Sequence, residues 1–406
     1  FSSHIIGLGY DAESEETNSI KWMPHRNKAH SRGGIEIALN SPSGKGILFG
    51  QNVAPANEKA VMNSLQLPEY ANSPGHIIFD GGKQKSFKFV LNSSSNVHGA
   101  AIYMGTGTHD ITIRNCIMDN NTPAIANRTK LPLVKYVGTE FTWEADSTGS
   151  GSNKDGYSAG IVNRGFLVKK EDLAEAEIIF NLDTIQNSNN VIENNEVSGF
   201  GYGIVSLGIG SLYNAHPDIN TYLRYYNEKT TIKGNTITDV ARSSIVVGFE
   251  ENALVSGNRI YDINGNYEAI GIMAGGQGRA DLDGYNNIEL EITGNEISDL
   301  SASEYVHGIR IEQDRVAYQG VQGGLLYFPD GDEQTLVSNN VVRDLASSDG
   351  SASLVGIHLM TRRNLQKAGW DMIIEADEDK YFTYDDKIVN NTVLVGDENS
   401  TSNDSP

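Results

Sequence analysis

The fold is decided by a six-residue phrase that reads IKGNTI at Ile232–Ile237 and VSGNRI at Val255–Ile260. The phrase contains an apolar residue, a polar residue, Gly or Asn, then Asn, any residue, and a second apolar residue. It recurs as IENNEV, ITGNEI, VSNNVV and IVNNTV, and a shortened form, IRNCI, precedes them all. Self-similarity of this kind indicates a repeat architecture. We assign one column of Asn residues to the repeat: Asn115, Asn195, Asn235, Asn258, Asn295, Asn340 and Asn391.

A second phrase follows most copies of the first and consists of a small residue, then Ile, then an alternating stretch. It reads GIVS, SIVV, GIMA, GIRI and GIHL, beginning at Gly203, Ser244, Gly271, Gly308 and Gly356. Each repeat unit is therefore two or three short strands joined by turns. The spacing between the last six Asn residues is 40, 23, 37, 45 and 51. The shortest spacing corresponds to one turn of a wide β-coil, and the longer ones to a turn plus an insertion.

Stacking explains why such a unit is stable, because a single unit is too small to bury its own apolar face. Strands pair in parallel with the units above and below, and the Ile and Val columns form a continuous interior. Asn at equivalent turns can form an amide ladder and tolerates left-handed backbone. The 43 Gly and 39 Asn residues fit a chain rich in tight turns. Four copies continue with an Asp in register, which we interpret as turn formers, with a calcium stripe as the alternative: Asp239, Asp262, Asp299 and Asp344.

These phrases resemble those of right-handed parallel β-helix repeat proteins, the superfamily that includes pectate lyase-like and other polysaccharide-active folds. The stretch HIIFDGG at His76–Gly82 is similar to the turn that opens many of them. The resemblance covers Gly75 to Val395. It implies an all-β fold, a right-handed parallel β-helix or solenoid with long loop insertions on one side. In its general style the chain also resembles large surface β-helix proteins that bacteria export by the type IX secretion system.

The repeat predicts one elongated domain rather than several compact ones. Residues 1–74 carry no repeat and are expected to form an N-terminal cap or a preceding solenoid segment. Residues 75–396 are the parallel β-helix, and 397–406 read as a linker, so we expect the chain to be part of a larger secreted protein. Insertions in solenoids collect on one face, which is commonly the binding face. They are expected at 123–190, 210–228, 275–288, 313–334 and 361–386.

Charge and composition exclude several classes of partner. The formal net charge is −21, so nucleic acid phosphates and anionic membrane surfaces would be repelled. The longest apolar run is far too short to span a bilayer. The single cysteine, Cys116, excludes a disulfide framework. No motif demands a cofactor, and calcium is the ion that exposed carboxylates would suit.

The best candidates for acid/base chemistry stand on the outward face of the second phrase. Aligning the copies places Arg310 and His358 in one column with Val205, Val246 and Met273, and places Glu312 in the next. A lyase acting on an acidic sugar needs a base and a cation, which Arg310, Glu312 and His358 could supply. The alternative is structural, because Arg310 with Glu312 or Asp314 also makes a simple salt bridge.

Carbohydrate could also bind to the aromatic and basic residues of the insertions. The candidates are Tyr318, Tyr327, Trp370, Arg362 and Arg363. The alternative is that these rings pack the insertions onto the coil.

A hydrolase would need two carboxylates across a cleft. Glu250 and Glu251 are adjacent on a strand and therefore point to opposite faces. Asp281 and Asp283, in an acidic loop containing Gly, are a weak calcium candidate because the full EF-hand spacing is lacking.

Two functions are compatible with these features. The favoured one is a non-catalytic solenoid, extracellular or on a bacterial cell surface, that acts in adhesion or as a structural, filament or surface-layer component. Its partners would be other segments of the same polypeptide or assembly, or a polysaccharide. The alternative is a carbohydrate-active enzyme, a polysaccharide lyase or glycoside hydrolase, that binds a glycan along the loop-covered face. Fold alone does not decide between them.

Overall fold

The computed structural model describes an all-β chain with several long, all-parallel sheets, and no helix occurs among the residues that it describes. Those residues are 2–8, 10–11, 35–39, 51–52, 75–83, 87–91, 98–104, 108–120, 133–137, 140–144, 158–164, 186–208, 210–213, 222–275, 287–313, 316–319, 324–327, 335–361 and 386–395.

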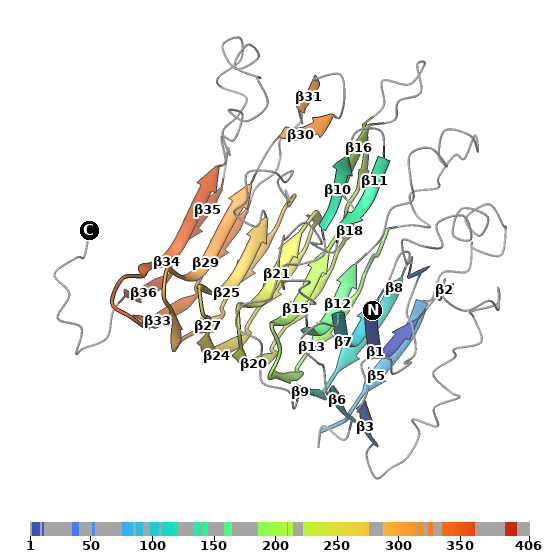
Figure 1. Ribbon diagram of the computed structural model, residues 1–406, viewed down its shortest axis with the longest axis horizontal. Helices are drawn as coiled ribbons and strands as arrows, with labels where there is room; N and C mark the ends of the chain where they lie inside the picture. The colour runs from blue at the N-terminus through green and yellow to red at the C-terminus, as the bar shows by residue number, and fades with distance from the viewer. Residues whose placement is uncertain are drawn as a thin grey trace, which may run out of the picture.

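Three sheets carry the fold (Figure 1). Sheet 1 has the order β1 (Ser2–Leu8), β7 (His98–Met104), β12 (Ser158–Arg164), β15 (Tyr202–Leu207), β21 (Ser243–Gly248), β25 (Glu268–Gly275), β29 (Tyr305–Gln313) and β34 (Ser353–Thr361). Sheet 2 has the order β5 (Gly75–Asp80), β8 (His109–Arg114), β13 (Val191–Glu193), β19 (Thr231–Lys233), β23 (Leu254–Ser256), β26 (Glu291–Thr293), β32 (Leu336–Ser338) and β35 (Lys387–Val389).

Sheet 3 runs alongside in the same chain order. Its strands are β3 (Ile35–Leu39), β6 (Phe87–Leu91), β9 (Cys116–Asn120), β14 (Glu196–Ser198), β20 (Thr236–Val240), β24 (Arg259–Asn264), β27 (Glu296–Ile297) with β28 (Leu300–Ala302), β33 (Val341–Ser347) and β36 (Thr392–Val395). From β8 to β36 the described chain repeatedly adds strands to sheet 2, sheet 3 and sheet 1 in turn. The two or three strands expected for each repeat unit are therefore distributed over three sheets.

The apolar positions of the two phrases form the core. In sheet 2, strand pairing aligns Ile113, Ile192, Ile232, Val255, Ile292 and Val337, and each is 0% exposed. The small residue of the second phrase is explained at Gly308. A Cβ built there would lie 2.3 Å from Cγ1 of Val342 and 2.5 Å from the carbonyl oxygen of Gly356. Sheet 1 and sheet 3 approach too closely at this point for a side chain.

Several expected insertions contain short strands of their own. The interval 123–190 includes β12, which pairs with β7 and β15, so it contributes a strand to sheet 1. Three antiparallel hairpins lie between the sheet strands: β10 (Leu133–Val137) with β11 (Glu140–Glu144), β16 (Gly210–Tyr213) with β17 (Tyr222–Tyr225), and β30 (Val316–Gln319) with β31 (Gly324–Tyr327). Two short parallel pairs complete the described strands: β2 (Tyr10–Asp11) with β4 (Gln51–Asn52), and β18 (Asn227–Glu228) with β22 (Glu250–Glu251). Residues 1–74 contribute β1 and β3 to sheets 1 and 3.

Six Asn side chains form a continuous amide ladder at the turn between sheet 2 and sheet 3. The Nδ2 of each donates to the Oδ1 of the next at 2.9–3.0 Å, and each backbone N–H donates to the same oxygen. The second Nδ2 hydrogen reaches back to a carbonyl, as Asn258 does to Ile232 at 3.0 Å. The ladder comprises Asn195, Asn235, Asn258, Asn295, Asn340 and Asn391.

Asn115, which we expected in this ladder, lies one position before it. Strand pairing sets Ile113 against Ile192 and Ile117 against Glu196, which places Cys116 opposite Asn195. The N–H of Cys116 accordingly donates to Oδ1 of Asn195 at 3.0 Å. Asn115 instead has a φ of 55°. The shortened phrase carries Cys where the others carry their second Asn, so its only Asn occupies the left-handed position that Gly or Asn fills elsewhere.

The Asp column marks a second left-handed turn. Asp239, Asp262, Asp299 and Asp344 have φ values of 52°, 60°, 57° and 56°. An L-residue in this conformation costs about 1–2 kcal/mol, and Asp and Asn tolerate it better than most others. The geometry accounts for these acids as turn formers. Burial, followed by the neighbouring charges of Asp262 and Asp119, raises the pKa of Asp239 above its ordinary value.

We expect Asp262→Ala to lower the free energy of unfolding by about 1 kcal/mol, because Ala is strained at positive φ. Asp262→Asn should change it by less than about 0.5 kcal/mol, since Asn tolerates the same φ and retains an oxygen for Asn264. Urea unfolding of the two variants checks this. Equal destabilisation by both substitutions would show that the carboxylate charge, rather than the backbone, matters here.

Candidate functional site

The outward column of sheet 1 aligns two of the three polar residues expected from the second phrase, Arg310 and His358. Strand pairing sets Met273 of β25 against Arg310 of β29, and Arg310 against His358 of β34. Arg310 is 9% exposed and Met273 is 4% exposed, so this part of the face is covered. Glu312 lies two residues after Arg310 on β29, and its backbone pairs with Gly275 and Met360. Its side chain lies outside the described residues.

The charge of Arg310 is compensated within this face. Its Nη1 lies 3.7 Å from Oε2 of Glu268, a residue at the start of β25. Arg242 contacts the other oxygen of the same carboxylate through Nε and Nη2. Glu268, itself 9% exposed, therefore lies between two guanidinium groups. Because removing one partner from a buried pair leaves an uncompensated charge, these three residues act together.

His307 lies beside this ion-paired group and was not among the expected site residues. Its ring stacks on that of His358 with centroids 5.2 Å apart, and Nε2 lies 3.3 Å from Nδ1 of His358. Its other nitrogen, Nδ1, is buried without a hydrogen-bond partner among the described residues. Burial, followed by the charges of Arg310 and His358, lowers the pKa of His307 to about 3. His307 is therefore neutral at physiological pH.

Two exposed tyrosines continue the line of rings past His307. The ring of Tyr305 is nearly parallel to that of His307, with an interplanar angle of 8° and centroids 6.3 Å apart. Tyr267 lies 5.9 Å from Tyr305. Tyr267 is 53% exposed and Tyr305 is 41% exposed, whereas His307 is 3% exposed. The face thus combines a neutral imidazole, a compensated arginine and two solvent-facing aromatic rings. Such groups can bind a polar ligand by stacking and hydrogen bonding.

The side chains of the remaining candidates lie outside the described residues. Tyr318 and Tyr327 belong to the hairpin of β30 and β31, and their side chains lie outside the described residues. The other five also lie outside the described residues: Trp370, Arg362, Arg363, Asp281 and Asp283. Within the described ranges, no three or more His, Cys, Asp or Glu side chains gather as a group that could hold a metal ion.

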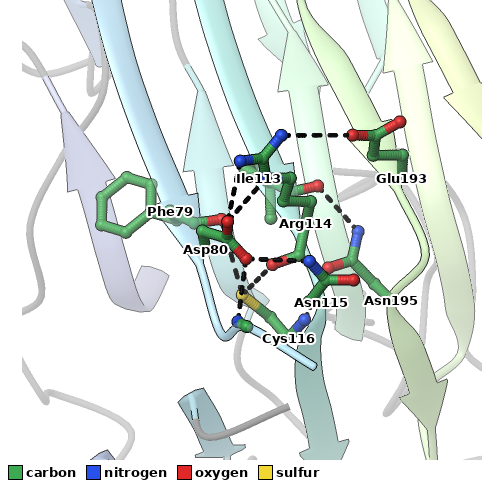
Figure 2. A network of polar contacts seen from close by, with 9 residues as sticks. Phe79, Asp80, Ile113, Arg114, Asn115, Cys116, Glu193 and Asn195 are labelled. Carbon is green, nitrogen blue, oxygen red and sulfur yellow. Dashed lines mark hydrogen bonds and ion pairs between the residues drawn. The ribbon is translucent and has the colours of Figure 1, made fainter. Parts of the chain in front are cut away.

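A second polar cluster lies at the turn after β5 (Figure 2). One oxygen of Asp80 accepts hydrogen bonds from Nδ2 of Asn115 and from the N–H of Gly82, both at 2.8 Å. The other oxygen contacts Nε and Nη2 of Arg114 at 2.8 Å. The bond from Asn115, followed by those from Gly82 and Arg114, outweighs burial and holds the pKa of Asp80 below its ordinary value. This carboxylate is an acceptor that fixes the turn.

The same cluster continues to the next unit and includes the single cysteine. Arg114 reaches Oε1 of Glu193 at 3.8 Å, and the buried thiol of Cys116 donates to the carbonyl of Arg114 at 3.1 Å. Figure 2 shows the side chains of Asp80, Arg114 and Glu193, which come from β5, β8 and β13, directed at one another. The two acids pair with the arginine, and the thiol bonds to a backbone carbonyl, which favours a structural role over a reactive one.

A third cluster is inside the stack, around Glu250. This residue is 0% exposed, and its Oε1 accepts hydrogen bonds from the Ser206 hydroxyl and from Nδ2 of Asn227, the latter at 2.9 Å. Asn163 in turn donates to Ser206 at 2.9 Å. Oε2 of Glu250 has no hydrogen-bond partner among the described residues. Burial, opposed by the bonds from Ser206, Asn227 and Thr230, raises the pKa of Glu250 to about 7.

The Glu250 cluster is enclosed by the sheets, so a polymeric substrate cannot reach it, and it belongs to the interior.

Among the described residues no helix has the length and apolarity required to cross a bilayer. No model of a known protein family matches this chain, and no curated protein matches its sequence. The class of protein is thus defined by the fold: an all-β chain of stacked parallel strands with a partly covered polar face on sheet 1.

Proposed function

We propose that the chain is a right-handed parallel β-helix whose role is that of a non-catalytic scaffold. The observation that carries the proposal is the amide ladder, in which six Asn side chains join successive units without a break. Such a ladder and three parallel sheets give an elongated body whose length grows with each unit. An extracellular or cell-surface location, as part of a larger secreted protein that acts in adhesion, a filament or a surface layer, fits the net charge of −21.

The pairing within the candidate site supports a scaffold over an enzyme. A cation that neutralises a substrate carboxylate must offer its charge to that substrate, whereas Arg310 already lies 3.7 Å from Glu268. The partners that suit a scaffold are neighbouring segments of the same assembly and polysaccharides. A pectate lyase-like relationship and export by the type IX system remain part of this proposal.

A polysaccharide panel tests the proposal. We expect purified protein to produce neither unsaturated products, read by ultraviolet absorbance, nor new reducing ends on acidic or neutral polysaccharides. Turnover of any member of the panel that is lost in Arg310→Ala would overturn the scaffold proposal. The control Arg259→Ala removes an arginine that lies over Tyr261 and is outside the candidate site. Turnover that survives in both variants would point to a contaminating enzyme, and the scaffold proposal would stand.

The second candidate, a carbohydrate-active enzyme, is favoured by one observation. His307 and His358 stack with ring nitrogens 3.3 Å apart, next to the position of Arg310, and an imidazole can take a proton from a substrate. If the panel reveals a substrate, His307→Gln and His358→Gln should each lower kcat by at least about 100-fold, as expected for loss of a general base. A rise in KM with kcat unchanged would assign these residues to substrate binding.

A further inference from the structure

The last described unit leaves the core of the stack open. Four inward positions of this unit are partly exposed, although their equivalents one unit earlier are buried. Leu359 of sheet 1 is 37% exposed, Ile388 of sheet 2 is 43%, and Val393 and Val395 of sheet 3 are 43% and 42%. The preceding residues in these columns are 0–1% exposed: Ile311, Val337, Val342 and Leu345. Apolar columns that are closed elsewhere therefore end on a water-exposed surface.

The amide ladder is open at the same end. Asn340 donates through both its N–H and its Nδ2 to Oδ1 of Asn391, at 2.9 Å each. Asn391 accepts these bonds and donates to the carbonyl of Val337 at 2.9 Å. Among the described residues, however, no Oδ1 lies beyond it to accept its own N–H and second Nδ2 hydrogen. The missing group is therefore defined: a side-chain amide oxygen one unit further along.

All three sheets end together at this surface. Among the described strands, β34 pairs only with β29, β35 only with β32, and β36 only with β33. Figure 1 shows these three strands at the same end of the stack. An edge strand presents unpaired N–H and C=O groups that favour pairing with another strand. The open surface thus combines three parallel edges, four apolar side chains and one unfilled ladder position.

We propose that the surface formed by β34, β35 and β36 is a docking site for one further repeat unit, a strand–turn–strand segment that carries Asn at the ladder position. The unit would add a parallel strand to each sheet, cover the four apolar side chains and supply Oδ1 to Asn391. This proposal rests on strand register and burial and is independent of whether the protein is catalytic. The partner is defined by the contacts that are repeated between the earlier units.

A second copy docked head to tail does not meet these requirements. The turn that follows β5 would be presented to Asn391, and it carries Gly81 and Gly82, which have no side-chain oxygen. The backbone N–H of Gly81 already donates to the carbonyl of Arg114 at 3.1 Å. The ladder would therefore remain open at such a junction, so we assign the surface to an Asn-bearing unit rather than to a second copy.

The chain itself supplies the probe for a direct test. Val395 belongs to the same column as Val240, through Ile263, Leu300 and Leu345. A copy of residues 241–264, fused after Val395 in place of residues 396–406, therefore continues the register through sheets 1, 2 and 3. In the control fusion this copy carries Asn258→Ala and Ile260→Asp, which remove the amide oxygen and the apolar contact. Both proteins are compared with the full chain.

We expect the amides of β35 and β36 to exchange with solvent at least about tenfold more slowly in the fusion than in the full chain. The control fusion should exchange like the full chain. Equal protection in the two fusions would overturn the proposal. So would a dimer of the full chain, detected by light scattering, that Val393→Asp converts to monomer, because the occupant would then be a second copy.

Discussion

Replacing Asn258 by Ala should lower the free energy of unfolding by about 4 kcal/mol. Asn258 is 1% exposed and takes part in four hydrogen bonds of the ladder through its side chain. Its Oδ1 accepts from the N–H and Nδ2 of Asn235 at 2.9 and 3.0 Å. Its Nδ2 donates to Oδ1 of Asn295 at 2.9 Å and to the carbonyl of Ile232 at 3.0 Å. The substitution leaves these partners buried and unsatisfied, which costs more than the bonds themselves contribute.

Asn391→Ala provides the matched control, because it removes the same group at the open end of the ladder. Asn391 is partly exposed, so water can replace the lost contacts with Asn340. We expect a loss of about 1 kcal/mol, measured like that of Asn258→Ala by urea unfolding. A loss at Asn258 no larger than that at Asn391 would refute a cooperative buried ladder.

Asn258→Asp should also lower the free energy of unfolding at neutral pH, because it removes both donors and buries a charge.

Replacing Glu250 by Gln should remove a large pH dependence of stability. The pKa of Glu250 is raised by burial from an ordinary value of 4.5 to about 7. As the pH rises from 4.5 to 7, the unfolded chain releases this proton while the folded chain retains it. Stability therefore decreases over that window, by about 3 kcal/mol in total, and levels off above it. Below pH 4.5 both states are protonated and Glu250 contributes no pH dependence.

Gln cannot ionise but can still accept the hydrogen bonds from Ser206 and Asn227. We therefore expect the difference in unfolding free energy, Glu250→Gln minus wild type, to grow by about 3 kcal/mol between about pH 4 and pH 8. Urea unfolding at several pH values measures it. The control Glu251→Gln changes the adjacent, partly exposed residue and should show no comparable trend. A constant difference for Glu250→Gln across the window would mean that Glu250 titrates as an ordinary acid.

Strand register and turn chemistry were readily predicted from sequence. Each residue of a stacked unit contacts its equivalent in the next, so the frame of the phrases already pairs Asn235 with Asn258 and Arg310 with His358. The prediction from the repeated phrases differs from the structure at two places. At the shortened copy, Cys116 rather than Asn115 occupies the ladder position. Within 123–190, Gly160-Ile161-Val162 is a further copy of the second phrase and forms part of β12.

The candidate site was only partly predictable. Arg310 and His358 were found because they interrupt an apolar column, whereas His307 carries no motif of its own. Its stacking on His358 joins two different columns of sheet 1. The ion pair of Arg310 with Glu268 likewise crosses from one unit to the preceding one and from one column to another. Whether two side chains in different columns make contact depends on their lengths and conformations, which the repeated phrases do not specify.

The sequence by itself determined an all-β chain of stacked parallel strands, because the repeated phrases state which positions are apolar and which turns need Gly, Asn or Asp. Only the tertiary structure decided how individual polar groups are paired and how deeply they are buried. Glu250 and Ser206 are 44 residues apart in the chain and meet inside the stack. The physical reason is that ladder contacts join equivalent residues of successive units, which the repeat already aligns. The burial of a polar group and its pairing with a residue of another column depend instead on the space between the three sheets.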